Sequence, residues 1–218
     1  MYAGKLFKKL SKKYYLHKFK HLSLDSRKCK KDDIFFSIIG EKKNGNKFIN
    51  DAIKNGARTI VSNLNFQGKK KNILFIKNNN VRKLVSEIAS EFYKETPSNL
   101  TAVTGTNGKS SIANFYFQIL KNNKLKVATI GTLGIKTNNS NELTNNTTLD
   151  PITIHKTLSL IKKKEIVNII LEASSHGLKQ HRLDGLKFDT TIFTNLSRDH
   201  LDYHKTYKDY FNSKLILF

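Results

Sequence analysis

The segment from Thr104 to Ser111, with the sequence TGTNGKSS, constrains the fold of this chain more than any other feature. It follows an apolar run that starts at Leu100, and it precedes a stretch in which apolar residues have helical spacing. Those residues are Ile112, Phe115, Tyr116, Ile119 and Leu120. A strand, a glycine-containing loop, a Lys-Ser pair and a helix in this order favour phosphate binding, because the loop N–H groups and the helix N-terminus are positive.

This phosphate loop is shorter than the common P-loop, because Val103 stands where that motif has its first glycine. Lys109 is placed to neutralise the outer phosphates of ATP, and Ser110 is placed to bind the accompanying Mg²⁺. The predicted ATP-binding residues are Gly105, Thr106, Asn107, Gly108, Lys109, Ser110 and Ser111.

Strand and helix patterns alternate from Asn99 onward, which predicts a parallel sheet with crossover helices. The strand candidates are Leu100–Thr104, Lys126–Ile130, Val167–Leu171 and Thr190–Thr194. Asp150 and Pro151 suit the start of a helix, as N-cap and first helical residue. Ligands of such sheets bind beyond the carboxyl ends of the strands. Glu172 and Asn195 directly follow two of these candidates, so they are predicted to lie at the phosphate edge.

Residues 22–96 predict a separate small α/β unit. Its strand candidates are Ile34–Ile39, Thr59–Val61 and Ile73–Ile76, and its helix candidates run from Phe48 to Ala57 and from Val81 to Tyr93. Glu95–Asn99 is the expected linker, because Pro97 discourages helix at the residue before it. We therefore expect two domains, residues 1–97 and 98–218, in an α/β fold whose second domain is a P-loop-type parallel sheet.

The formal net charge of +22 raises the question of a nucleic-acid partner. Most of the excess is lysine, whereas nucleic-acid interfaces depend on the bidentate contacts of arginine. A solvated lysine-rich surface is the favoured interpretation, so no specific nucleic-acid partner is expected. No apolar run approaches the roughly 18 residues of a membrane span, and residues 1–21 lack the apolar core of a secretory signal. The single cysteine, Cys29, fits a reducing cytoplasm.

Two further groups of residues are candidates for metal binding. Glu172 is either an ordinary glutamate at a strand end or a Mg²⁺ ligand beside Ser110, and the phosphate loop at the same edge favours the ligand. His200 and His204 are four residues apart, but no cysteine accompanies them, so a zinc site is disfavoured. We expect His200 to assist the magnesium site.

The run from Ser174 to Arg182 concentrates hydroxyl, imidazole, amide and guanidinium groups. A serine-rich turn after a strand often serves only as a helix cap. Gln180 and Arg182, in a chain poor in arginine, instead favour recognition of an anionic, hydroxyl-rich substrate.

Lys214 interrupts an apolar stripe on a predicted helix that Thr206 caps. The stripe consists of Tyr207, Tyr210, Phe211, Leu215 and Phe218. A lysine there either extends its ammonium group to water past a buried stem, or it is a functional amine with a lowered pKa. The sequence pattern leaves both readings open.

Together these stretches resemble the Mur ligases of peptidoglycan synthesis, which are ATP-dependent acid–amino-acid ligases. The phosphate loop is similar to the ATP loop that this family shares with the folylpolyglutamate synthetases. Three stretches distinguish the Mur ligases from the folylpolyglutamate synthetases, and they resemble the Mur ligases that add the third residue of the stem peptide. These stretches are Asn146–Thr148, Ser174–Arg182 and Thr194–His204. Leu24–Arg27 and Phe35–Gly40 are similar to the uridine-binding domain of that branch.

The resemblance implies a site for each substrate and cofactor. Leu24 and Ser26, with the loop after Gly40, would hold the uridine end of UDP-MurNAc-L-Ala-D-Glu. Its muramoyl-peptide end would contact Asn146, Thr147, Thr148, Ser174, Gln180 and Arg182. Magnesium would be surrounded by Ser110, Glu172 and His200, and Lys214 matches a lysine that the family carbamylates to hold a second magnesium ion. Lys109, Glu172, His200 and Lys214 would be the catalytic residues.

The implied reaction forms an acyl phosphate on the dipeptide, which the amine of meso-diaminopimelate or L-lysine then attacks. The family's remaining central domain and its C-terminal domain have no counterpart in the 218 residues, so we expect a truncated or split ligase whose partner is the missing part. The alternatives are a fragment that only binds UDP-MurNAc-dipeptide and a folylpolyglutamate-type ligase.

Overall fold

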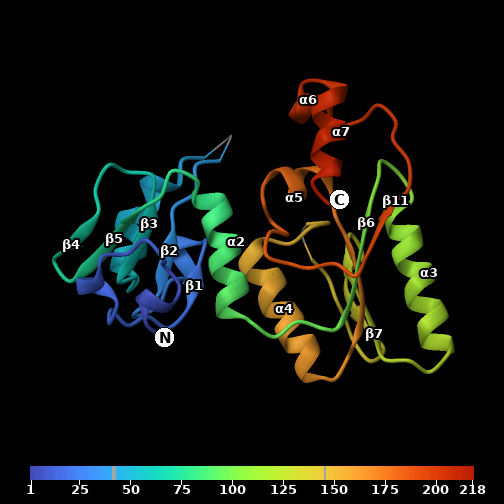
Figure 1. Cartoon of the computed structure of the whole chain (residues 1–218), viewed down its shortest axis with the longest axis horizontal. Coiled ribbons are helices and arrows are strands. Elements are labelled where there is room, and N and C mark those ends of the chain that lie inside the picture. Colours follow the sequence, from blue (N-terminus) through green and yellow to red (C-terminus); the bar gives the residue numbers. More distant parts are fainter. Residues whose placement is uncertain (41–42, 145) are drawn as a thin grey trace. The chain divides into compact units, whose positions relative to one another are not determined.

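The computed structural model describes residues 1–40, 43–144 and 146–218 (Figure 1). It divides into two compact units, Met1–Phe92 and Tyr93–Phe218. Each unit contains one mainly parallel sheet with helices, so the predicted α/β fold class is confirmed. Among the described residues, no helix is both long enough and apolar enough to cross a membrane.

The first unit has a five-stranded sheet in the order β1-β2-β3-β5-β4. Its strands are β1 (Leu22–Ser23), β2 (Ile34–Phe36), β3 (Thr59–Ser62), β4 (Gly68–Lys70) and β5 (Ile73–Lys77), and its helices are α1 (Ile49–Lys54) and α2 (Val81–Phe92). Only β4 is antiparallel to its neighbour. The predicted strand Ile34–Ile39 ends earlier, at Phe36. Residues 1–21 also belong to this unit and bury Phe7, Leu10 and Phe19.

The second unit has a six-stranded sheet in the order β11-β6-β10-β7-β8-β9. Its strands are β6 (Asn99–Thr104), β7 (Val127–Gly131), β8 (Gly134–Thr137), β9 (Asn141–Glu142), β10 (Asn168–Glu172) and β11 (Thr190–Phe193). The four predicted strands are all present, and they are parallel to one another. Sequence patterns did not predict β8 and β9, which extend the sheet antiparallel to β7.

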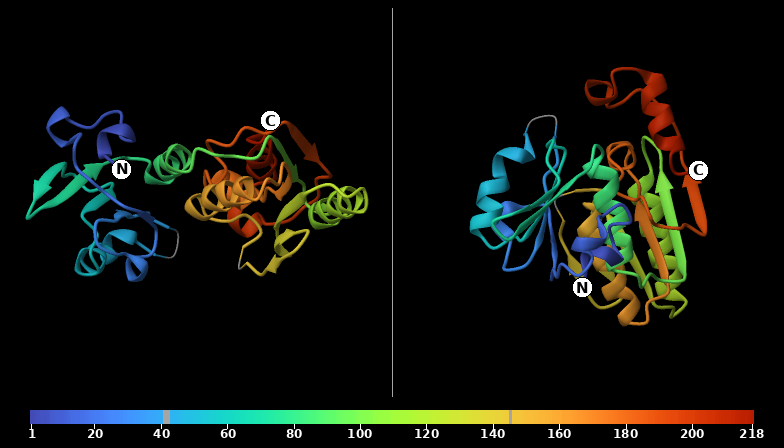
Figure 2. Two further views of the ribbon diagram at one scale, coloured as in Figure 1. Left: turned by 90° about the horizontal axis from the view of Figure 1, so that it is seen from below. Right: turned by 60° about the vertical axis from the view of Figure 1, so that its left-hand side comes forward.

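Helices cover both faces of this second sheet. The helices of this unit are α3 (Lys109–Asn122), α4 (Pro151–Lys163), α5 (Ser175–Lys179), α6 (Leu201–His204) and α7 (Tyr207–Leu215). Figures 1 and 2 show α3 and α4 on opposite faces. Successive residues of β6 point to the two faces: Ala102 packs in the cluster with Leu158 of α4, and Val103 packs in the cluster with Ala113 of α3. Asp150 caps α4 as predicted, by accepting bonds from the N–H groups of Ile152 and Thr153.

In α3 the buried residues are Ala113 and Phe117, and Ile112 and Tyr116 of the apolar pattern pack partly buried against the sheet, whereas Phe115 and Ile119 are exposed. The buried face of α7 differs from the predicted stripe. Of the members of the stripe, only Tyr210 is buried. The buried face of α7 consists of Tyr210, Ser213 and Lys214. This face is buried because it turns toward the phosphate loop, which Tyr210 and Lys214 contact. The other stripe members, Tyr207, Phe211, Leu215 and Phe218, are exposed.

Candidate functional site

The phosphate loop joins β6 to α3 and requires glycine at two positions. Gly105 has φ +148°, and a Cβ there would lie 1.8 Å from the hydroxyl of Thr194. Gly108 has φ +84° and is the N-cap of α3. Glycine adopts such backbone angles without steric cost. The first N–H groups of α3 lack partners within the helix and so face the loop as anion donors.

The segment that follows β11 fixes the conformation of this loop. The N–H of Thr106 donates to the carbonyl oxygen of Asn195 over 2.9 Å, and the N–H of Asn107 donates to the Asn195 side chain over 3.0 Å. The hydroxyl of Thr194 donates to the carbonyl oxygen of Asn107 over 2.6 Å. The hydroxyl of Thr106 lies 3.0 Å from that of Tyr210 on α7. The loop is therefore held from outside before any phosphate binds.

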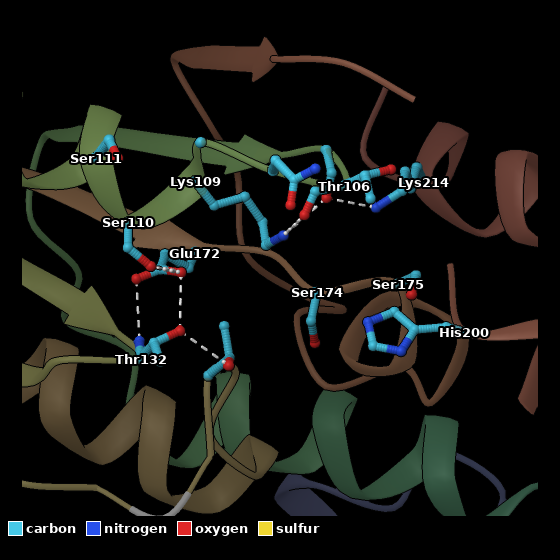
Figure 3. A pocket seen from close by; sticks show the side chains of 14 residues that line it. Thr106, Lys109, Ser110, Ser111, Thr132, Glu172, Ser174, Ser175, His200 and Lys214 are labelled. Atoms are coloured by element: carbon cyan, nitrogen blue, oxygen red, sulfur yellow. Dashed lines mark hydrogen bonds between the residues drawn. The ribbon is translucent and has the colours of Figure 1, made fainter. Parts of the chain in front are cut away.

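Two lysine ammonium groups meet at one carbonyl oxygen of the loop. Nζ of Lys109 lies 2.8 Å from the oxygen of Gly105, and Nζ of Lys214 lies 2.7 Å from the same atom (Figure 3). Lys214 is 1% exposed. Burial, and secondarily the charge of Lys109, lower the pKa of Lys214 to about 8. Burial likewise lowers the pKa of Lys109. Both amines are thus held at the phosphate loop, where in their protonated form they place positive charge.

Glu172, the last residue of β10, faces the same site and is 2% exposed. Its carboxylate accepts bonds from the hydroxyl of Ser110 over 2.8 Å and from both the N–H and the hydroxyl of Thr132 over 3.0 Å (Figure 3). Gly131 makes this possible, because a Cβ there would lie 2.2 Å from a carboxylate oxygen of Glu172. The site thus holds a buried carboxylate beside the phosphate loop.

The residues around Glu172 fit a magnesium ion. Mg²⁺ binds oxygen ligands, usually one or two protein groups together with waters and phosphate oxygens. Ser110 and Glu172 supply one hydroxyl and one carboxylate at hydrogen-bond distance from each other. No group of three or more His, Cys, Asp or Glu side chains suited to a metal occurs in the described ranges.

A second polar cluster lies beside this site, around Thr148. Its hydroxyl donates to the carbonyl oxygen of Glu172 over 2.9 Å and lies 3.0 Å from that of Ser174. Nη1 of Arg182 donates to the carbonyl oxygen of Thr148 over 2.6 Å, and Nη2 donates to the side-chain oxygen of Gln180 over 2.8 Å. Four of the residues that sequence assigned to a substrate are thereby joined in one network.

A pocket of about 280 Å³ collects most of the predicted residues. It is lined by Gly105 to Ser111, Thr132, Thr147, Glu172, Ser174, Ser175, His200 and Lys214. Thr148, Gln180 and Arg182 lie behind Ser174, and Asn146 is exposed outside the lining. Leu24 and Ser26 belong to the other unit. The predicted loop after Gly40 includes residues 41 and 42, which lie outside the described residues.

Sequence reasoning missed Thr132, and it considered His204 only as a disfavoured zinc ligand. Thr132 directly follows β7 at the same sheet edge as Glu172, so the rule that identified Glu172 also applies to it. His204 is fully buried behind the pocket, and Nε2 lies 2.9 Å from the hydroxyl of Ser175. Nothing in its sequence position indicates this contact.

Comparisons with known proteins find two family patterns in this chain. The Mur ligase middle domain matches residues 103–218, and the Mur ligase family catalytic domain matches residues 18–93. The UDP-N-acetylmuramoyl-L-alanyl-D-glutamate–2,6-diaminopimelate ligase of Rickettsia prowazekii (strain Madrid E) is 39% identical over 206 residues, which cover 93% of this chain and 42% of that protein. The ligase of the same name from Rhizobium meliloti (strain 1021) is 38% identical, with 90% and 40% covered.

Solved structures agree with these matches. The structure of a ligase with the same name superimposes with a TM-score of 0.81 at 30% identity, over 96% of this chain and 42% of the other. The MurF ligase from Thermotoga maritima in complex with ADP shares the fold, with a TM-score of 0.62 at 19% identity over 91% and 42% of the two chains. The chain spans about two-fifths of the length of the curated relatives that it matches.

Proposed function

This chain belongs to the Mur ligase family, and from that membership we propose that it forms the part of a peptidoglycan ligase that binds UDP-MurNAc-L-Ala-D-Glu and the phosphates of ATP. The observation that carries the proposal is the pocket in which Lys109, Lys214 and the Ser110–Glu172 pair face one another. The names of the relatives favour 2,6-diaminopimelate over L-lysine as the diamino acid.

The proposed reaction has two steps. An oxygen of the terminal carboxylate of the dipeptide attacks the γ-phosphorus of ATP, the bond to the β–γ bridging oxygen breaks, and ADP leaves. The amine nitrogen then attacks the carbonyl carbon of the acyl phosphate, phosphate leaves, and the nitrogen loses a proton. Both steps build charge on phosphoryl oxygens, which preorganised positive groups stabilise.

Each residue of the pocket has a role in this proposal. Lys109 and the N–H groups at the start of α3 bind the transferred phosphoryl group. Glu172 and Ser110 would hold Mg²⁺, which supplies further positive charge to the phosphate oxygens when bound. His200 would assist that ion, and Lys214 would hold a second ion once carbamylated. Ser174, Thr148 and Arg182 would orient the muramoyl-peptide end, together with Asn146, Thr147 and Gln180.

The first unit would bind the uridine end of the nucleotide sugar, within residues 1–97. Leu24 and Ser26 are the proposed contacts. Asp25 shapes this turn, because its side chain accepts the N–H of Arg27 at the start of a 3₁₀ turn. The substrates of such a ligase are cytoplasmic metabolites, so we place the protein in the cytoplasm.

Isothermal calorimetry tests the proposal directly. We expect the chain to bind UDP-MurNAc-L-Ala-D-Glu, without competition from folate, and to bind a non-hydrolysable ATP analogue. Lys109→Met should weaken the analogue about 10- to 100-fold, the value of a charged hydrogen bond. The matched control is Lys156→Met, on the exposed side of α4, which should bind normally. A folded chain that gives no heat with the nucleotide sugar would refute the proposal.

Turnover separates this proposal from its alternatives. The described pocket contains groups for the phosphates and for the dipeptide, and the chain spans two-fifths of its relatives, so we expect binding without tripeptide synthesis. Formation of UDP-MurNAc-tripeptide from ATP by the purified 218 residues, detected by mass spectrometry, would show a complete ligase instead.

A further inference from the structure

Residues 1–21 carry a much higher charge per residue than the rest of the chain (dark blue in Figure 1). This segment contains seven lysines and neither aspartate nor glutamate, so its formal charge is +7. Because the whole chain carries +22, the other 197 residues share +15, which is less than a quarter of the segment's charge per residue. The general abundance of lysine in this protein therefore does not account for the segment.

The segment folds so that its lysines face solvent. Phe7, Leu10 and Phe19 are buried in the first unit. All seven lysines are exposed, namely Lys5, Lys8, Lys9, Lys12, Lys13, Lys18 and Lys20. Among the ion pairs of the described residues, only Lys20 of this segment takes part, with Asp32 over 3.7 Å. Within the part of the chain that the structure describes, most of this positive charge is therefore left to solvent or to a partner.

Large apolar and aromatic side chains are exposed beside these lysines. Leu16 is 80% exposed, and Tyr2 and Tyr15 are 38% and 37% exposed. The N–H of Gly4 donates to the carbonyl oxygen of Tyr15 over 3.1 Å, so the two ends of the segment lie side by side. Nζ of Lys18 lies 5.7 Å from the centre of the Tyr2 ring. The segment thus presents an apolar and aromatic area next to positive charge.

This combination fits the surface of a bilayer that contains anionic phospholipids. Lysines near such a surface are attracted to its phosphate headgroups, and each strengthens the contact about fivefold. Tyrosine rings prefer the headgroup level, and an aliphatic side chain enters the boundary below it. A nucleic acid would also attract the lysines, but its interfaces depend on arginine, which the segment lacks. An exposed aliphatic side chain does not contribute to phosphate contacts.

We propose that residues 1–21 form a docking surface for an anionic phospholipid bilayer. In this contact the lysines face the lipid phosphates, and Leu16 enters the boundary between headgroups and acyl chains. The contact is peripheral and reversible, because one leucine and two partly exposed tyrosines bury little apolar area. It involves the first unit alone and does not depend on the proposed ligase function.

Co-sedimentation with vesicles tests the electrostatic part of this contact. We expect the full chain to bind vesicles of phosphatidylglycerol and phosphatidylcholine and to dissociate from them in about 0.5 M salt. Vesicles of phosphatidylcholine alone should not bind it. A quadruple glutamine variant of the segment should bind at least about 100-fold more weakly. Its substitutions are Lys8→Gln, Lys9→Gln, Lys12→Gln and Lys13→Gln.

The matched control removes the same charge from the second unit. It replaces four exposed lysines with glutamine, namely Lys121, Lys124, Lys163 and Lys164. This variant should lose less than about threefold in affinity, because these lysines do not face the bilayer. Circular dichroism should show that both variants are folded. Equal losses in the two variants would overturn the proposal, since binding would then depend on net charge and not on this segment.

A tryptophan reporter tests the insertion of Leu16. The chain contains no tryptophan, so Leu16→Trp supplies the only indole emission of the protein. With anionic vesicles this emission should move to shorter wavelength, and brominated lipids should quench it. Leu143→Trp is the control, because Leu143 is 84% exposed in the second unit, and its emission should stay unchanged. An unchanged emission of Leu16→Trp on vesicles that bind the protein would overturn the proposal.

Competition with duplex DNA separates a lipid surface from a general polyanion site. Anionic vesicles should retain the protein when duplex DNA is added at an equal concentration of phosphate. Displacement from the vesicles by that DNA, or failure of the folded chain to bind anionic vesicles at low salt, would refute the docking surface.

Discussion

The buried amine of Lys214 gives the sharpest quantitative expectation for this protein. Burial and the nearby Lys109 lower its pKa to about 8, from 10.5 for an ordinary lysine. At pH 7 the neutral fraction is then about one in ten, compared with about one in 3,000 for an ordinary lysine. Lys214 should therefore be about 300 times richer in the nucleophilic form that reacts with CO₂.

The pKa can be measured on protein that carries ¹³Cε-labelled lysine. One resonance should titrate with a midpoint near pH 8, and it should be missing from Lys214→Met. Lys109→Gln should raise the midpoint only part of the way, because burial is the larger cause. Lys156→Gln, on the surface of α4, should not move it. A midpoint of about 10 or higher would refute the reasoning, since that is the value of a solvated amine.

The lowered pKa of Lys214 also makes the stability of the protein depend on pH. Between pH 8 and 10.5 the unfolded chain still binds the proton that folded Lys214 has released. The free energy of unfolding should therefore rise with pH in this window, by about 3 kcal/mol in total. Urea denaturation should show the rise in the wild type and a smaller one in Lys214→Met.

Carbamylation of Lys214 is a chemical test for its neutral amine. The neutral amine adds to CO₂ through a new N–C bond and loses a proton, which creates an anion suited to a magnesium ion. Protein in ¹³C-bicarbonate at pH 8 should show a carbamate carbon that Lys214→Met lacks and Lys156→Gln retains. If the amine titrates near pH 8 but forms no carbamate, then the role of Lys214 is structural: its side chain holds the loop through the hydrogen bond to Gly105.

Three further expectations concern Gly131, α4 and His155. Gly131→Ala should displace the Glu172 carboxylate, which would lie 2.2 Å from the new Cβ, and a magnesium titration should show weaker binding with the secondary structure intact by circular dichroism. Asp150→Ala should cost about 1 kcal/mol in urea denaturation, because it removes the N-cap of α4. Burial lowers the pKa of His155 to about 4, so stability should fall by about 3 kcal/mol from pH 7 to 4, and His155→Gln should reduce that fall.

The elements that define the sheet could be predicted from local signals. The four predicted runs became the parallel strands of the second unit. Three of them are largely buried and mostly apolar, as is usual in parallel sheets, whereas β11 is exposed or half-buried. Asp150 and Thr206 both cap helices as their residue types suggested. These features depend on neighbours close in sequence, where residue type and spacing carry the information.

The buried face of α7 could not be predicted from hydrophobic periodicity. A lysine and a serine are buried beside Tyr210, whereas the apolar Phe211 and Leu215 are exposed. The contacts of Lys214 with Gly105 and of Tyr210 with Thr106 decide which side is buried, and one sequence does not contain those contacts.

The register of β6 with β10 explains how the two halves of the pocket meet. β6 is a buried strand from Leu100 to Thr104. Val103 is paired in register with Glu172 of β10, and the N–H of Ala173 donates to its carbonyl oxygen. That pairing places the carboxylate beside the first turn of α3, where Ser110 reaches it over 2.8 Å. The register of β6 with β10 therefore aligns the buried carboxylate with the phosphate site.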